Sequence, residues 1–142
     1  MKKIILIHGP NLNLLGERAK EHYGDVTLAK LEKIVTKEAE KSGVKIIAFQ
    51  SNHEGGLIDF LQKNRKKADG IIINPGALAH YSYALHDALL DSQIPSVEVH
   101  LSDIGQREKW RRVSVTASAC KKIISGKKIE GYLEALHYLS KI

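Results

Sequence analysis

A glutamate and a histidine stand two positions apart at the end of an apolar, β-branched run. In residues 96–100, Glu98 and His100 alternate with Val97 and Val99. Because side chains alternate across a strand, the glutamate and the histidine share one face and the valines share the other. A carboxylate beside an imidazole orients the ring and tunes its affinity for a proton, as a general acid requires. The pattern favours His100 as a general acid; the alternative is a histidine that only caps a backbone carbonyl.

A tyrosine in a long irregular segment is the second candidate. Residues 10–24 contain Asn11, Arg18, His22 and Tyr23, and a connection of this length is often a lid over a site. A tyrosine ionises only at about pH 10, so as a base at neutral pH it needs positive charge beside it. Arg18 in the same segment can supply this positive charge. Tyr23 is therefore a candidate base, with a simple loop anchor as the alternative.

Two further groups are suited to binding an anion or hydroxyl groups. Asn74, Pro75, Gly76 and Ala77 lead to His80 ahead of a predicted helix, and backbone N–H groups at a helix start attract carboxylates. Ordinary strand-to-helix turn chemistry explains the same residues. Three arginines surround Trp110 and form either an anion clamp or a plain basic turn: Arg107, Arg111 and Arg112.

Metal, serine and Schiff-base chemistry fit this sequence poorly. The seven histidines show neither His-Glu-x-x-His nor His-x-His spacing, and no Gly-x-Ser-x-Gly motif occurs. Lys3 and Lys45 lie near strand starts, away from the polar clusters that a Schiff base would have to join. We therefore expect acid–base chemistry by tyrosine and histidine, with stabilisation by arginine and asparagine, and with no metal and no cofactor.

The elements that must position these residues alternate between strand and helix. Strands are predicted at residues 3–8, 44–50, 70–74, 96–100 and 121–125. The first helix is predicted to run from Thr27 as N-cap to Gly43 as C-cap. Further helices are predicted at 55–66, 81–91 and 129–139, with a short helical turn at 108–112. The helix at 81–91 is expected to point Ala84, Leu85, Ala88 and Leu89 inward. The pattern predicts one α/β domain over residues 1–142, with a flavodoxin-like five-stranded parallel sheet and helices on both faces.

Polar residues follow the ends of four predicted strands, at positions 9–11, 50–52, 74–77 and 98–102. The carboxyl ends of parallel strands meet at one edge of the sheet, where ligands bind in such folds. The sequence therefore predicts a single site at that edge.

Composition limits the class of protein. The 142 residues carry a net charge of +6, but the lysines fall on helix faces and turns and no aromatic-basic ladder accompanies them, so we expect neither a nucleic-acid nor a membrane partner. The apolar run after Lys3 is too short for a signal-peptide core. Cys120 is the only cysteine, which rules out an internal disulfide. A cytoplasmic location is expected.

Taken in order, these motifs resemble type II 3-dehydroquinate dehydratases. The matching stretches are residues 9–16, Arg18 with Tyr23-Gly24, 49–52 with 54–55, 73–77 with 80–82, 84–85 with 87–88, 97–102, and 107–108 with Arg111. The resemblance covers nearly the whole chain. The lid departs from the family pattern, because Arg18 is followed by Ala19-Lys20 in place of Glu-Pro, which predicts a more mobile lid.

The resemblance implies dehydration of 3-dehydroquinate to 3-dehydroshikimate in the shikimate pathway. It implies that Tyr23, aided by Arg18, removes a proton, that a water near Asn11 holds the enolate, and that His100 protonates the departing hydroxyl. The substrate-binding residues that it implies are Asn74, His80, Leu101, Ser102 and Arg111, together with Asp87 reaching a neighbouring subunit's site in a homododecamer, a tetramer of trimers.

Two other classes of function remain to be weighed. A flavodoxin-like module for a nucleotide or flavin would carry phosphate-loop glycines and stacking aromatics at the strand ends, which this chain lacks. An inactive oligomerisation scaffold would tolerate the loss of Tyr23 or His100, and both are present.

Overall fold

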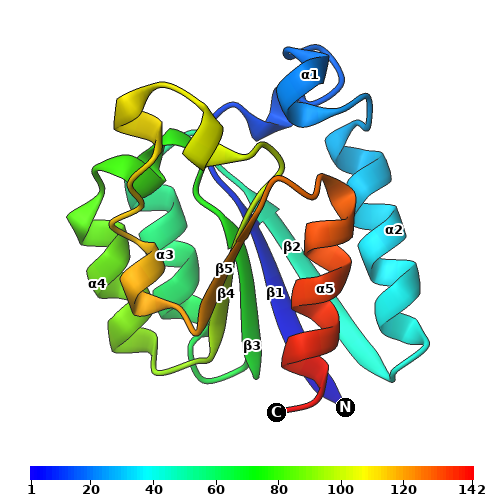
Figure 1. The fold of residues 1–142 in the computed structure, drawn as a ribbon. Coiled ribbons are helices and arrows are strands. Elements are labelled where there is room, and N and C mark those ends of the chain that lie inside the picture. Colours follow the sequence, from blue (N-terminus) through cyan, green and yellow to red (C-terminus); the bar gives the residue numbers. More distant parts are fainter.

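The computed structural model describes residues 1–142 and contains one parallel sheet with the strand order β2-β1-β3-β4-β5 (Figure 1). This is the flavodoxin-like order, as predicted. The strands differ from the predicted ones by one residue at the start of β1 and of β5. They are β1 Lys2–His8, β2 Val44–Gln50, β3 Gly70–Asn74, β4 Ser96–His100 and β5 Lys122–Ser125.

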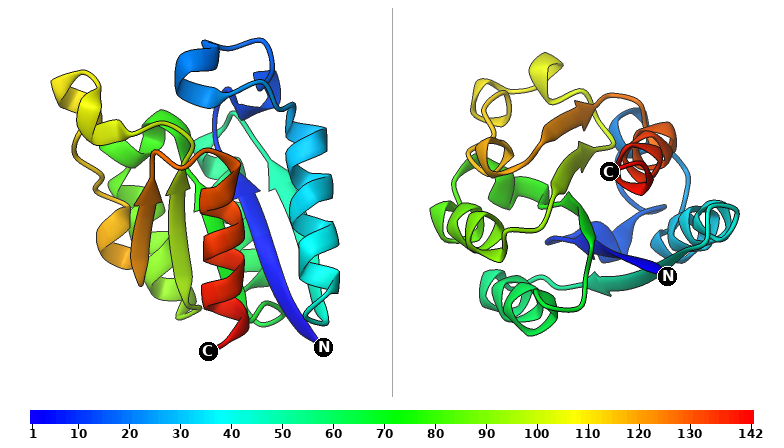
Figure 2. Two further views of the ribbon diagram at one scale, coloured as in Figure 1. Left: turned by 45° about the vertical axis from the view of Figure 1, so that its right-hand side comes forward. Right: turned by 90° about the horizontal axis from the view of Figure 1, so that it is seen from below.

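Helices cover both faces of the sheet (Figure 2). Helices α2 (Leu28–Glu40) and α5 (Ile129–Ser140) pack on one face, and α3 (Glu54–Asn64) and α4 (Tyr83–Ser92) pack on the other. The interior strand β1 supplies both cores by simple alternation, since its successive fully buried residues point to opposite faces. Because both faces of β1 are buried, its apolar residues 4–7 form an uninterrupted run instead of alternating with polar ones.

The end of helix α2 differs from the prediction, and α3 ends at Asn64, two residues before its predicted end. Helix α2 begins as expected, with the Thr27 hydroxyl accepting a hydrogen bond from the Lys30 backbone N–H. It ends at Glu40, however, and Gly43 lies beyond it, in a left-handed conformation (φ 69°) in the turn before β2. Gly43 is therefore a turn glycine and not the C-cap.

The start of the third large helix was placed too early. A 3₁₀ helix, η2 (Gly76–His80), follows β3, and α4 begins only at Tyr83, after the Ser82 side chain has capped it. Leu85, Ala88 and Leu89 are buried as predicted, whereas Ala84 is exposed. The exposed position is one residue from Leu85 and thus lies about 100° around the helix.

The loops after β1 and β3 meet backbone to backbone at the point where the strand order reverses. The Gly9 N–H donates to the Asn74 carbonyl (2.8 Å), and a Cβ at Gly9 would lie 2.3 Å from the Pro75 carbonyl oxygen. Only glycine permits this approach. The same end of the molecule carries a short helix absent from the prediction, α1 (Lys20–Tyr23), and the loop after β4 (Figure 1).

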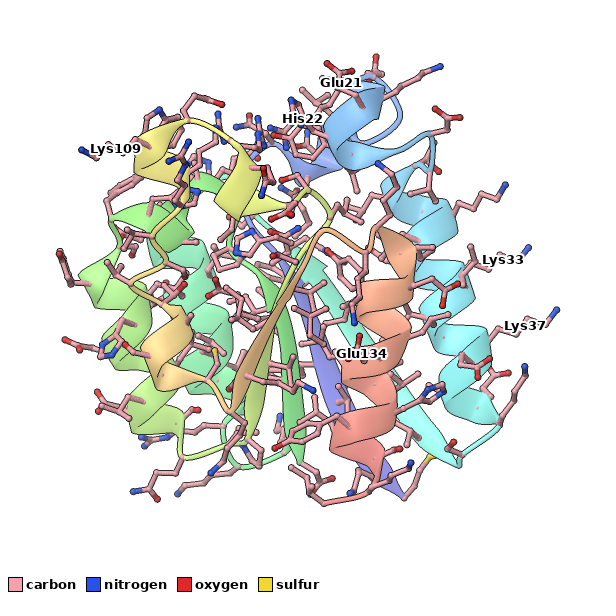
Figure 3. All side chains as sticks on the ribbon, viewed as in Figure 1. Glu21, His22, Lys33, Lys37, Lys109 and Glu134 are labelled. Carbon is pink, nitrogen blue, oxygen red and sulfur yellow. The ribbon has the colours of Figure 1, made fainter.

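Lysine side chains on the outer surface of α2 are exposed to solvent. Lys33 and Lys37 project from α2 away from the molecule (Figure 3), and both are exposed. No helix is both long enough and apolar enough to cross a membrane.

Candidate active site

A pocket lies at the carboxyl ends of β1, β3 and β4, at the edge predicted for the site. The loops after these three strands supply all its walls. Its lining residues are Pro10, Asn11, Leu12, Arg18, Tyr23, Asn74, Gly76, Ala77, His80, His100, Leu101, Ser102, Ile104, Arg107 and Arg111.

The Tyr23 hydroxyl oxygen lies between two guanidinium groups. Arg18 Nη2 donates to it at 2.9 Å and Arg107 Nη1 donates to it at 2.8 Å. The Arg18 guanidinium carbon also stands 3.9 Å from the centroid of the tyrosine ring. Two cationic donors on one phenolic oxygen stabilise negative charge on that oxygen. The arrangement suits a tyrosine that acts as a base.

Arg18 contacts Tyr23 although Ala19-Lys20, and no proline, follows Arg18 in the sequence. Tyr23 is the last residue of α1, and Gly24 follows it with φ 78°. The Lys128 ammonium, from the N-cap of α5, donates to the Glu21 carbonyl at 3.3 Å and so ties α1 to the body of the protein. The placement of Arg18 against Tyr23 therefore needs no proline.

On β4, Glu98 and His100 form a buried pair. His100 Nε2 lies 2.7 Å from the Glu98 carboxylate, and their side chains are 6% and 0% exposed. Because a carboxylate accepts, the Nε2 atom carries a proton and donates it. The other ring nitrogen, Nδ1, is left for a ligand in the pocket. Val97 and Val99 lie on the opposite face, in the core beneath α2 and α5, as the alternation predicts.

His80 is fixed at one ring nitrogen, and its surroundings favour the neutral ring. Its Nδ1 atom donates to the Val113 carbonyl at 2.7 Å, which leaves Nε2 as the acceptor. Partial burial lowers the pKa of His80, and the hydrogen bond to the Val113 carbonyl only partly opposes this. The ring stands edge-on to Trp110, whose face supports the Arg111 guanidinium at 4.0 Å from its centroid. This side of the pocket thus offers a hydrogen-bonding histidine and one fixed cation.

Asn74 has a fixed side-chain orientation. Its Oδ1 atom accepts from the Gly76 N–H at 3.0 Å, and its Nδ2 atom donates to the Tyr132 hydroxyl at 3.1 Å. Burial raises the pKa of Tyr132, and the hydrogen bond from Asn74 only partly opposes this. Tyr132 therefore stays neutral and is a poorer candidate for a base than Tyr23.

The sequence and the architecture match one family along nearly the whole chain. The class II dehydroquinase family model matches residues 2–140. The 3-dehydroquinate dehydratase of Caldicellulosiruptor saccharolyticus is 51% identical, with 100% of this chain and 99% of that protein covered. The chain belongs to the class II dehydroquinases. Another family member, the 3-dehydroquinate dehydratase of Thermotoga maritima, is 49% identical over 98% of this chain and 95% of its own length.

A crystal structure of a type II dehydroquinase supports the same assignment. The enzyme from Butyrivibrio crossotus superposes with a TM-score of 0.95 at 42% identity, with 97% of each chain covered. The family was therefore identified correctly from the ordered motifs.

The pocket brings together eight of the nine site residues predicted from the sequence. Those that line it are Arg18, Tyr23, Asn74, His80, His100, Leu101, Ser102 and Arg111. Asp87 lies outside it, on α4, with its side chain 71% exposed and bonded to His86 Nδ1 at 2.9 Å. Within one chain, then, Asp87 is a surface residue.

The cluster after β2 supports the site without lining it. Asn52 Oδ1 accepts from the Asn11 backbone N–H at 2.9 Å and from Gln50 Nε2 at 3.0 Å. These bonds hold Asn11 in its left-handed conformation (φ 71°) at the pocket wall. The prediction that all four strand-end clusters meet at one edge is confirmed, with a supporting role for the second.

Arg107 is the functional candidate that sequence reasoning left unassigned. Besides Tyr23, its Nη1 atom contacts Ser102 Oγ at 3.3 Å, and its side chain is only 10% exposed. The sequence did place Arg107 in a possible anion clamp with Arg111 and Arg112. Nothing local distinguishes which of the three arginines turns toward Tyr23, because that depends on the path of the loop.

Proposed function

We propose that this chain dehydrates 3-dehydroquinate to 3-dehydroshikimate, a step of aromatic amino acid biosynthesis through the shikimate pathway. The observation that carries the proposal is the Tyr23 oxygen between Arg18 and Arg107 in the same pocket as His100. A base and an acid in one pocket are what an elimination of water requires. Family membership supplies the identity of the substrate.

In the proposed reaction, Tyr23 as phenolate takes a proton from the carbon beside the ketone. The electrons of that C–H bond form an enolate, which a water near Asn11 stabilises. His100 then gives a proton to the departing hydroxyl, the C–O bond breaks, and water leaves as the enone forms. The hydrogen bond to Glu98 supports His100 in this role, because a neighbouring carboxylate stabilises the imidazolium.

Substrate contacts are proposed for both sides of the pocket. Asn74 and the backbone of Leu101 and Ser102 bind the carboxylate, while His80 and Arg111 bind ring hydroxyls. The Leu101 and Ser102 carbonyls accept from the backbone N–H groups of Lys128 and Gly126, which holds that stretch of backbone in place. The neutral state of His80 suits a hydroxyl better than a carboxylate.

Purified protein incubated with 3-dehydroquinate and EDTA tests the function directly. The enone product absorbs in the ultraviolet, so a saturable rise in absorbance is expected. No rise above the buffer rate would refute the proposal.

We also propose that the chain assembles as a homododecamer, a tetramer of trimers, in which Asp87 reaches a neighbour's pocket. The exposed position of Asp87 beside the exposed Tyr83 supports this. Asp87→Ala should then lower activity, and so should dilution to monomers. A monomer that light scattering shows to be fully active under assay conditions would contradict the assembly role.

A further inference from the structure

The buried Glu98 carboxylate is held by two hydroxyl groups as well as by His100. Ser114 Oγ donates to Glu98 Oε2 at 2.5 Å, and Thr116 Oγ1 donates to Oε1. His100 Nε2 shares Oε2 with Ser114. Both Glu98 and Thr116 are fully buried, so water is not available to replace the Thr116 hydroxyl.

These contacts fix the carboxylate in one orientation. If His100 were the only donor, the carboxylate could rotate about its last bond and still accept one hydrogen bond. With a donor on each oxygen, rotation would leave a buried hydroxyl or a buried carboxylate oxygen without a partner, which is costly. The plane of Glu98, and through it the direction in which His100 presents Nδ1, thus depends on Ser114 and Thr116.

The same short segment, residues 113–116, also holds the other histidine of the pocket. The Val113 carbonyl accepts from His80 Nδ1 at 2.7 Å, and the Val115 N–H donates to the Ala79 carbonyl at 2.7 Å. Val113 and Val115 therefore bond to η2 through their backbone, whereas Ser114 and Thr116 bond to Glu98 through their side chains. The two imidazole rings stand 6.3 Å apart and nearly parallel, at 19°. The segment sets the position of both rings together.

We propose that Ser114 and Thr116 are positioning residues for the general acid, holding Glu98 so that His100 faces the departing hydroxyl. The inference rests on the proposed dehydration. It differs from the mechanism above in assigning a catalytic effect to two side chains that do not line the pocket.

The test compares Thr116→Val with Thr116→Ser in the full-length enzyme. Valine has the shape of threonine but no hydroxyl, and serine keeps the hydroxyl. Thr116→Val should lower kcat by about 10- to 100-fold, the range expected when a reacting group is displaced or loses its supporting contact. KM should change little, because the contact acts on the transition state. Thr116→Ser should restore most of the rate.

Two further variants keep the result interpretable. Ser118→Ala removes an exposed hydroxyl that bonds only the Val115 carbonyl, so it should keep the wild-type rate. Ser114→Ala supplies a second measurement if Thr116→Val does not fold, since Ser114 is only partly buried. It should lower kcat in the same way.

The outcomes separate the two proposals. Wild-type protein that does not dehydrate 3-dehydroquinate refutes the function itself. An active wild type with a folded Thr116→Val of unchanged kcat refutes the positioning role alone. A Thr116→Ser variant as slow as Thr116→Val would also refute it, because the hydroxyl would then not be the group that matters.

Discussion

Arg107 gives the sharpest test of how Tyr23 is activated. We expect Arg107→Met to slow dehydration while Arg18 remains as a second donor. Methionine keeps much of the apolar stem and removes the charge and both hydrogen bonds, to Tyr23 and to Ser102. The fold should survive, because the lost contacts lie in the pocket and not in either core.

The size of the effect follows from the geometry. The lost bond is a 2.8 Å contact from a cation to the oxygen that must carry negative charge. Hydrogen bonds to charged groups contribute about 1.5–3 kcal/mol, which corresponds to about 10- to 100-fold in rate. The Arg107 side chain is 10% exposed, so solvent replaces it poorly. A loss near the upper end of the range is therefore expected.

The assay is the initial rate of enone formation, with kcat and KM determined separately. Lys109→Met removes the same charge from the same loop at an exposed position (Figure 3) and serves as the matched control. Arg107→Lys should fall between the two, because an ammonium keeps the charge but not the planar fork. If kcat for Arg107→Met lay within about twofold of the Lys109→Met value, the loss would be far smaller than expected. That result would refute the reasoning.

Three other substitutions or treatments test separate parts of the structure. Tyr23→Phe should reduce kcat by at least about 100-fold with an unchanged circular dichroism spectrum; retention of a tenth of the rate would count against Tyr23 as the base. Burial raises the pKa of the Cys120 thiol to about 12, with the Glu98 charge adding to the effect, so iodoacetamide at pH 8 should alkylate native protein about a thousandfold more slowly than urea-unfolded protein. Mass spectrometry showing equal rates would contradict this burial. Tyr132→Phe should lower the free energy of unfolding by about 1 kcal/mol and raise KM, because Asn74 Nδ2 loses its acceptor; an unchanged KM would mean that Tyr132 does not orient Asn74.

Much of the fold was readable from sequence because hydrophobic patterning is local. Continuous β-branched runs located all five strands to within one residue. The spacing of the apolar stripes located the four long helices between and after them. The misplaced boundaries have physical causes. Helix α1 has four residues, too few to show a periodic stripe. The predicted start of α4 at residue 81 is two residues early, because Ser82 is the N-cap and the helix begins only at Tyr83.

The site was readable to the extent that strand ends determine it. Residues at the ends of β3 and β4 converge because the sheet is parallel, and the sequence shows that directly. Contacts made across the chain were not readable. Arg107 reaches Tyr23 over 84 positions, and Thr116 reaches Glu98 over 18. The type of each residue permits such a contact, but only the path of the loop after β4 determines which arginine and which hydroxyl make it.

That loop contacts both the proposed base, Tyr23, and the carboxylate behind the proposed acid, His100. It leaves β4 directly after His100, brings Arg107 onto the Tyr23 oxygen, and returns through Thr116 to the carboxylate behind His100. A displacement of the loop would therefore weaken the base and misalign the acid at the same time. If this coupling holds, Arg107→Met and Thr116→Val should not act independently, and their combined loss in kcat should be smaller than the product of the single losses. If the loss in the double variant equalled the product of the single losses, the contacts of Arg107 and Thr116 would act independently.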